Sequence, residues 1–205
     1  YNRTCPGYCS VNVDDAQMGA LAARALTDQG CTSAAILTGT PVFEGMEVRA
    51  QGFALEGGRH GMGMPATHYC ENSIRGGYES ARLRLAGQWK EQMPQGLFCG
   101  SSMIAHGVMR ALWESGIPHE NWPKLVAVGN GAEDQDRATM PSLSVVRLPM
   151  EEMAGECLRL LLAVMAGEVS APESRMLEVR YIPRESCGPL HQEEETKELA
   201  NWSNV

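Results

Sequence analysis

The stretch Ala34-Ala-Ile-Leu-Thr38 and the helical segment that follows it at residues 44–56 decide the fold. The first is an apolar run of strand length, and such a run is typical of a strand buried inside a sheet. The second segment stops at Gly57-Gly58, where glycine ends a helix easily. A buried strand that leads into a helix is the basic unit of α/β proteins.

The same alternation extends outward from this unit along most of the chain. Helices are expected at residues 16–29, 44–56, 74–91, 103–115 and 149–166, and strands at residues 34–38, 66–70, 96–99, 124–129, 142–148 and 176–182. Strands that alternate with helices of this length imply parallel strands joined by crossover helices. The sequence therefore predicts an α/β fold, a parallel sheet with helices on both faces.

Composition excludes several classes of protein. The chain has 205 residues, 43% hydrophobic and 20% charged, which is a globular composition and not that of a disordered, collagen-like or coiled-coil chain. Its net charge of -8 repels phosphate backbones, so the chain is not expected to grip nucleic acid by itself. No apolar run approaches the roughly 18 residues that span a bilayer, so no membrane contact is expected.

The seven cysteines indicate a reducing compartment. Their number is odd, no CxxC pair occurs, and their spacing is irregular, so a disulfide framework is not expected. Thiols in apolar runs, such as Cys70 and Cys99, behave as small hydrophobic groups. These features favour a cytoplasmic location.

The residue patterns of common enzyme sites are missing. Ser101 or Ser102 opens a helix after a strand without a GxSxG elbow, and a helix N-cap is the favoured interpretation. No two histidines have the helical spacing of metal ligands. The pair Cys5 and Cys9 has no second pair of ligands elsewhere in the sequence that would complete a zinc site. The glycine cluster at 57–63 does not fit a phosphate-binding or dinucleotide-binding loop. We expect no catalytic residue, no metal and no cofactor.

Two polar residues stand out because ligands of open α/β sheets bind beyond the carboxyl ends of the strands. Arg49 lies in a helix that begins near such an end, where a guanidinium can bind sugar hydroxyls or a carboxylate. Asp14 opens the first helix. A surface arginine and an N-cap aspartate are the alternative interpretations, about as probable as ligand contacts, although capping and ligand contact are compatible.

An ordered set of motifs resembles the effector-binding region of the lactose-repressor/galactose-repressor family. The motifs are Val13-Asp14 with Gly19, Arg49-x-x-Gly52-Phe53, the run 96–107, Ala111-Leu-x-x-x-Gly116-Ile-Pro118, Leu125-Val-Ala-Val-Gly129, Pro141-x-Leu143-Ser-Val-Val146 and Tyr181-Ile-Pro-Arg184-Glu-Ser186. The resemblance covers about residues 11–187 in consistent order. No single motif is decisive, and the ordered set carries the assignment.

The resemblance implies a periplasmic-binding-protein-like (type I) fold of two lobes with a small effector between them. Residues 31–146 and 175–187 would form the C-terminal lobe, and residues 1–30 and 147–174 part of the N-terminal lobe. Residues 188–205 are expected to be an acidic, disordered tail. The helix-turn-helix head that the family carries has no counterpart in this sequence, and the chain starts without Met, so we expect a piece of a longer protein.

The resemblance also implies a ligand site and names its residues. Asp14 and Arg49 match the family's polar contacts, and Asn72, Ser101 and Asn130 occupy neighbouring site positions. The family usually has an aromatic residue at position 72, Asn-Asp at 101–102 and Asp at 131, where this chain has Asn, Ser-Ser and Gly. The ligand could therefore differ from an ordinary sugar, for example by being more anionic, or the pocket could be degenerate.

The expected function is effector sensing in a bacterial transcriptional regulator. A sugar or sugar derivative would favour one angle between the lobes, and a homodimer would pass the change to DNA through the missing head. A periplasmic-type sugar-binding protein for transport is the alternative, and an enzyme is a weaker one. The apolar stripe of the helix at 149–166 is expected to lack an intramolecular partner and to make oligomer contacts.

Overall fold

A computed structural model describes residues 7–41, 44–129, 133–169 and 172–188. The strands are β1 Ser10–Val13, β2 Ala34–Gly39, β3 Ala66–Cys70, β4 Gly96–Cys99, β5 Lys124–Gly129, β6 Ser144–Arg147, β7 Ser174–Leu177 and β8 Arg180–Ile182. The helices are α1 Asp15–Asp28, α2 Glu44–Arg59, α3 Ile74–Leu85, α4 Gln88–Glu91, α5 Ser102–Glu114, α6 Glu133–Arg137 and α7 Met150–Met165. Two short 3-10 turns complete the set, η1 at His119–Asn121 and η2 at Glu185–Cys187.

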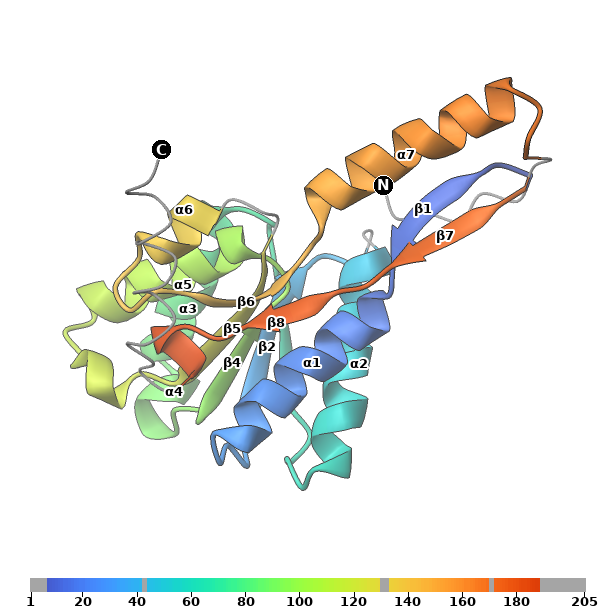
Figure 1. The fold of residues 1–205 in the computed structure, drawn as a ribbon. Coiled ribbons are helices and arrows are strands. Elements are labelled where there is room, and N and C mark those ends of the chain that lie inside the picture. Colours follow the sequence, from blue (N-terminus) through green and yellow to red (C-terminus); the bar gives the residue numbers. More distant parts are fainter. Residues whose placement is uncertain (1–6, 42–43, 130–132, 170–171, 189–205) are drawn as a thin grey trace.

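The larger part of the molecule, which we call the body, is a six-stranded sheet with the order β3-β2-β4-β5-β6-β8. Its neighbouring strands pair in parallel except for β8, which runs antiparallel to β6. Helices α1 and α2 cover one face, and α3, α4 and α5 cover the other (Figure 1). The predicted α/β architecture is confirmed.

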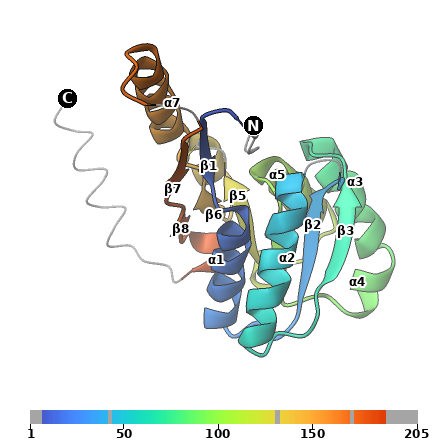
Figure 2. The ribbon, with the colours of Figure 1, turned by 90° about the vertical axis from the view of Figure 1, so that its right-hand side faces the viewer.

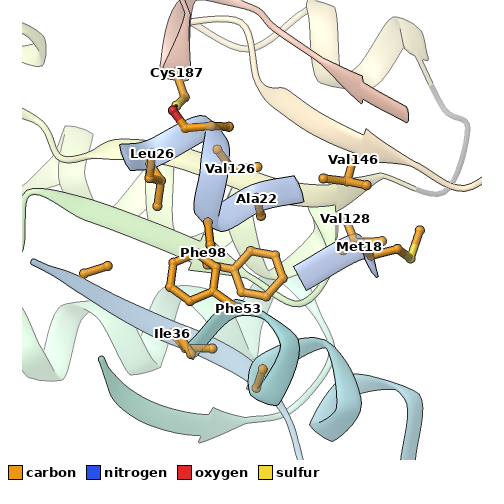
Figure 3. Packing of buried hydrophobic residues seen from close by; sticks show 14 of the residues in the cluster. Met18, Ala22, Leu26, Ile36, Phe53, Phe98, Val126, Val128, Val146 and Cys187 are labelled. Carbon is orange, nitrogen blue, oxygen red and sulfur yellow. The ribbon is translucent and has the colours of Figure 1, made fainter. Parts of the chain in front are cut away.

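Alternate residues of the central strands feed two separate hydrophobic clusters. In β2, Ile36 packs with α1 and α2, whereas Leu37 packs with α3 and α5. Both side chains are completely buried, because successive side chains of a strand point to opposite faces and each face is covered. In the first cluster the rings of Phe53 and Phe98 stack with centroids 4.9 Å apart (Figure 3).

The crossing of α1 and α2 depends on a residue without a side chain. A Cβ atom added to Gly52 would lie 2.2 Å from the carbonyl oxygen of Ala16, well inside van der Waals contact. Glycine lets the two backbones approach, and this brings the first turn of α1 beside the middle of α2. The approach matters for the site, because it brings Arg49 to Asp15.

A smaller unit, which we call the arm, projects from the body. It consists of β1, α7 and β7, with β1 and β7 paired in parallel as a two-stranded sheet (Figures 1 and 2). Three chain segments join the arm to the body: Val13 to Asp15, Arg147 to Met150, and Leu177 to Arg180. Several large apolar side chains of the arm are exposed: Leu158, Leu161, Leu162, Val164, Met165 and Met176.

This arrangement corrects the expected division of the chain in two places. Residues 1–30 were grouped with 147–174, but α1 packs on the body, where Met18, Ala22 and Leu26 join the cluster of Phe53 and Phe98. β7 was assigned with the C-terminal lobe, but it pairs with β1 in the arm. A helix belongs to the unit against which its apolar stripe packs, and the apolar pattern of the sequence does not identify that unit. The acidic tail after Gly188 lies outside the described residues.

Element boundaries differ from the expected ones in small ways. The helix expected at 74–91 is two helices, α3 and α4, separated at Ala86-Gly87. The strand expected at 176–182 is split into β7 and β8, because the chain leaves the arm and enters the body there. A periodic pattern does not record such a change of partner.

Candidate functional site

The candidate site lies at the edge of the body where the carboxyl ends of β2, β3 and β4 meet the first turns of α2 and α5. In parallel sheets this edge collects the loops that bind ligands. The joints to the arm leave the body from the same edge, since β6 ends there and α1 begins there (Figure 1).

Arg49 is anchored at this edge by two interactions. Its Nε donates to Oδ1 of Asp15 over 2.6 Å, and its Nη1 donates to the carbonyl oxygen of Gly100 over 3.0 Å. Both side chains of the ion pair are more than nine-tenths buried. A buried pair with additional hydrogen bonds holds its geometry, because removal of either partner would leave an uncompensated charge. Arg49 is therefore preorganised and not a mobile surface residue.

Asp14 has a different position from its neighbour. Its side chain is exposed and accepts a hydrogen bond from the backbone N–H of Gln17 over 2.9 Å, as the N-cap of α1. The capping interpretation of Asp14 is confirmed. The structure does not pair it with Arg49, and the carboxylate that reaches Arg49 belongs to Asp15.

The sequence reasoning passed over Asp15, although a signal for it was present. Asp15 lies three residues before Met18 and seven before Ala22, so it continues the buried stripe of α1. A carboxylate on a buried stripe requires a partner, and Arg49 is the cation that the neighbouring helix supplies. Asp14 and Asp15 are the same residue type, and only their positions on the helix distinguish them.

Asn72 and Ser101 meet next to this ion pair. The Ser101 hydroxyl donates to Oδ1 of Asn72 over 2.5 Å, and it also caps α5 by accepting from the N–H of Ile104. Asn72 is exposed, and its side-chain oxygen accepts the hydrogen bond from Ser101. The two predicted residues thus form one hydrogen-bonded unit. Asn130 and Gly131 lie outside the described residues.

The thiols near this edge are not activated nucleophiles. Burial raises the pKa of Cys70, whose Sγ donates weakly to the carbonyl oxygen of Thr38 over 3.7 Å. Burial also raises the pKa of Cys99 far above its ordinary value. Both thiols therefore remain protonated at neutral pH.

A hydrogen-bonded hydroxyl and carboxylate lie beside the site, in β3 and α2. The hydroxyl of Tyr69, in β3, donates to Oε2 of Glu47, in α2, over 2.9 Å. This hydrogen bond raises the pKa of Tyr69, because ionisation would place two negative charges side by side. The arrangement presents hydroxyl, amide, carboxylate and guanidinium groups along one edge, which are hydrogen-bonding groups for a polar ligand.

Within the described ranges, no group of three or more His, Cys, Asp or Glu side chains is arranged to hold a metal ion. Across the part of the chain that the structure describes, no helix has the length and apolar character to cross a membrane.

The sheet, its helical layers and the polar edge define an α/β domain of the binding-protein type. The family model of the periplasmic binding protein-like domain matches residues 23–187. The chain therefore belongs to that family, and it is an effector-binding domain of the LacI type.

Two curated relatives come from Bacillus subtilis (strain 168). The HTH-type transcriptional repressor MelR is 32% identical over 118 residues, 58% of this chain and 33% of MelR. The uncharacterized HTH-type transcriptional regulator YvdE is 39% identical over 89 residues, 43% of this chain and 27% of YvdE. The matched stretches thus span about a third or less of these relatives.

Solved structures have the same fold. A LacI family transcription regulator from Clostridium acetobutylicum has a TM-score of 0.83 and 29% identity, over 90% of this chain and 68% of that chain. A LacI family regulator from Enterococcus faecium with bound ribose has a TM-score of 0.79 and 22% identity, over 92% of this chain and 68% of that one. A CelR–cellobiose complex has a TM-score of 0.76 and 23% identity, over 88% and 54%.

Proposed function

We propose that this chain is the effector-sensing domain of a bacterial DNA-binding transcriptional regulator, and that its ligand is a sugar or sugar derivative bound beside Arg49. The observation that carries the proposal is the buried Arg49–Asp15 pair at the carboxyl edge of the sheet. It holds a guanidinium in one orientation where ligands of this fold class bind. The sugar-bound relatives, with ribose and cellobiose, and the HTH-type regulators support the same proposal.

The charge of the site favours a neutral ligand over a strongly anionic one. Asp15 offsets the positive charge of Arg49, and Asn72 and Ser101 add only neutral hydrogen-bonding groups. A sugar offers several hydroxyls that act as both donors and acceptors, and these match amide, hydroxyl and guanidinium partners. The resemblance gives Asn-Asp in the family where this chain has Ser101-Ser102, so one carboxylate is missing from the site, which changes the choice of sugar.

The mechanism we propose is a population shift between two inter-lobe arrangements. The arm would be part of the second lobe, and the three joints between arm and body would bend when that lobe closes over the ligand. The ligand shifts the equilibrium only by its difference in affinity for the two arrangements. A homodimer would transmit the shift to DNA-binding heads, with the protein in the cytoplasm and with no catalytic step.

The test is a thermal-shift and calorimetric screen on the full-length protein with ribose, cellobiose, ribose 5-phosphate and gluconate. A bound sugar should raise the melting temperature by mass action, by an amount that grows with its concentration. Neutral sugars should bind more tightly than the phosphate and the acid. Turnover of any sugar, or the absence of binding by every neutral sugar tried, would overturn the proposal.

Variants at the site sharpen this test. Asn72→Ala should weaken sugar binding by roughly tenfold, because a site built to hydrogen-bond a hydroxyl loses a partner. Because Asn72 is exposed, the melting temperature of the Asn72→Ala variant without ligand should stay near that of the parent protein. Arg59→Gln, at the far end of α2, is the matched control and should bind normally. Equal affinity in Asn72→Ala and the parent protein would place the site elsewhere.

Light scattering and DNA binding of the full-length protein check the remaining parts. A dimer whose affinity for DNA falls or rises when sugar is added agrees with the proposal. A monomer that never binds DNA and is recovered outside the cytoplasm would instead support a transport binding protein.

A further inference from the structure

A cavity of about 470 Å³ lies at the amino end of the sheet, opposite the candidate site. It is formed where the last turns of α5, the η1 segment, the start of β5, the residues before β6 and the η2 turn converge. Its volume lies in the range of small-molecule pockets. The lining residues that carry the argument are Met109, Trp113, Trp122, Met140, Glu120 and Glu185.

Two indoles contribute to the wall of this cavity. Trp113 lines the cavity from α5, and its side chain is 71% exposed, so its ring is accessible to a ligand. Trp122 lines the cavity from the chain segment after η1, and its Nε1 donates to the carbonyl oxygen of Ile117 over 2.9 Å. Because that donor is already used, Trp122 offers a ligand its ring and no hydrogen bond.

Two carboxylates, Glu120 and Glu185, line the cavity together with His119 and Lys124. Glu185 accepts a hydrogen bond from the backbone N–H of Ser142 over 2.7 Å, and among the described residues no cation pairs with it. Glu120 is 3.4 Å from the ring nitrogen Nδ1 of His119, and both of these side chains are largely exposed. The cavity thus combines two indoles with carboxylates.

Lys124 also contributes to the lining, but its charge acts on the other face of the sheet. Strand alternation places Leu125 in the cluster beneath α5, and Lys124 therefore projects toward the α1 side. Burial raises the pKa of Cys31 and of Cys187, and the positive charge of Lys124 partly offsets both increases. Both thiols belong to the α1-side cluster.

We propose that this cavity is a second binding site, which takes a small organic cation with an apolar body, such as an aryl- or alkylammonium ion. An aromatic face attracts a cation through its quadrupole, and a carboxylate adds a charge-assisted contact. Methionine side chains such as Met109 and Met140 can adjust to the apolar body of the ligand. The cavity does not depend on the proposed sugar site, because the sugar site lies at the amino end of α5 and the cavity lies at its carboxyl end.

The experiment compares three probes that share a benzene ring: benzyltrimethylammonium, benzyl alcohol and benzenesulfonate. Each is titrated into the full-length protein by calorimetry, without sugar. The cation should bind about tenfold more tightly than the neutral alcohol, and the sulfonate should bind more weakly still. If the alcohol binds as tightly as the cation, or the sulfonate binds more tightly, the proposal is overturned.

Three variants locate the binding. Trp113→Leu should reduce affinity for the cation about tenfold, and Glu185→Gln should reduce it several-fold while the amide oxygen still accepts from Ser142. Glu178→Gln removes an exposed carboxylate paired with Arg180 outside the cavity and should change nothing. Melting temperatures near that of the parent show that the variants are folded. Unchanged cation binding in folded Trp113→Leu would exclude this cavity.

Discussion

Helices α5 and α7 have the same kind of apolar stripe but opposite surroundings. α5 lies on the body and buries Ile104, Val108 and Leu112 completely. α7 lies on the arm, and within its length only Leu160 is buried. Amphipathicity is a property of the sequence, whereas burial requires a partner surface. The exposed stripe of α7 is the surface for which the sequence analysis predicts oligomer contacts.

The body and the arm therefore differ in how they are stabilised. The body closes two hydrophobic clusters, one on each face of its sheet. The arm has a two-stranded sheet and one helix, and a sheet of this size is marginal without further cover. Substitutions in the body should therefore change the free energy of unfolding more than similar substitutions in the arm.

The largest effect is expected in the stacked pair of the body. Phe53→Ala removes a fully buried ring that stacks on Phe98, so it should lower the free energy of unfolding by about 3–5 kcal/mol. Leu161→Ala in the arm, where the side chain is 56% exposed, should change it by less than about 0.5 kcal/mol. Urea unfolding followed by circular dichroism measures both. Similar losses in the two variants would mean that the arm is covered in solution.

A pair of glycines gives a second, smaller contrast. A Cβ atom at Gly107 would lie 2.0 Å from the carbonyl oxygen of Ile74, so Gly107→Ala should force α5 away from α3 and lower the free energy of unfolding by about 1–3 kcal/mol. Gly155 in α7 is the matched control, since the nearest atom to its Cβ is an Arg159 nitrogen at 3.7 Å. Gly155→Ala should be neutral or stabilising, by up to about 1 kcal/mol.

The two glycine variants are compared in one denaturation series on the full-length protein. If Gly107→Ala is as stable as Gly155→Ala, then the α3–α5 crossing is looser than the structure describes. The control also tests whether α7 is a helix in solution, because the gain from alanine requires helical backbone.

The smallest effect concerns pH and the outer end of the α1–α2 pair. The hydrogen bond from Arg24 lowers the pKa of Glu56, and Arg59 and His60 add to this effect. The stabilisation is present above the pKa of Glu56 in the unfolded chain and is lost as the pH falls through its lower folded-state value. The melting temperature of the parent should therefore fall more steeply than that of Glu56→Gln as the pH is lowered from 6 toward 3.

The comparison with Glu56→Gln isolates this contribution from other carboxylates. Glu79→Gln serves as the control, since Glu79 pairs with Arg75 on an exposed surface where such pairs contribute little. Parallel pH curves for Glu56→Gln and the parent would show that the ion-pair network adds no stability.

Part of the geometry at the candidate site could be anticipated from the sequence, and the part that could not has a physical cause. Arg49 was singled out by its place in a helix after a buried strand, and the place of Ser101 at a helix start predicted its N-cap role, whereas the family resemblance put Ser101 in the site. Asp15 was missed because residue type alone does not distinguish it from Asp14. Only the crossing of α1 and α2 reveals that Asp15 faces Arg49 while Asp14 faces solvent.

The sequence by itself determined the alternation of strands and helices, the parallel sheet and the buried faces of its central strands, because periodicity and apolar runs are local properties. Tertiary structure alone decided which unit α1 and β7 join, which carboxylate meets Arg49, and where the indoles of Trp113 and Trp122 converge. These outcomes depend on contacts between segments far apart in the chain, and no local pattern records which surfaces will meet.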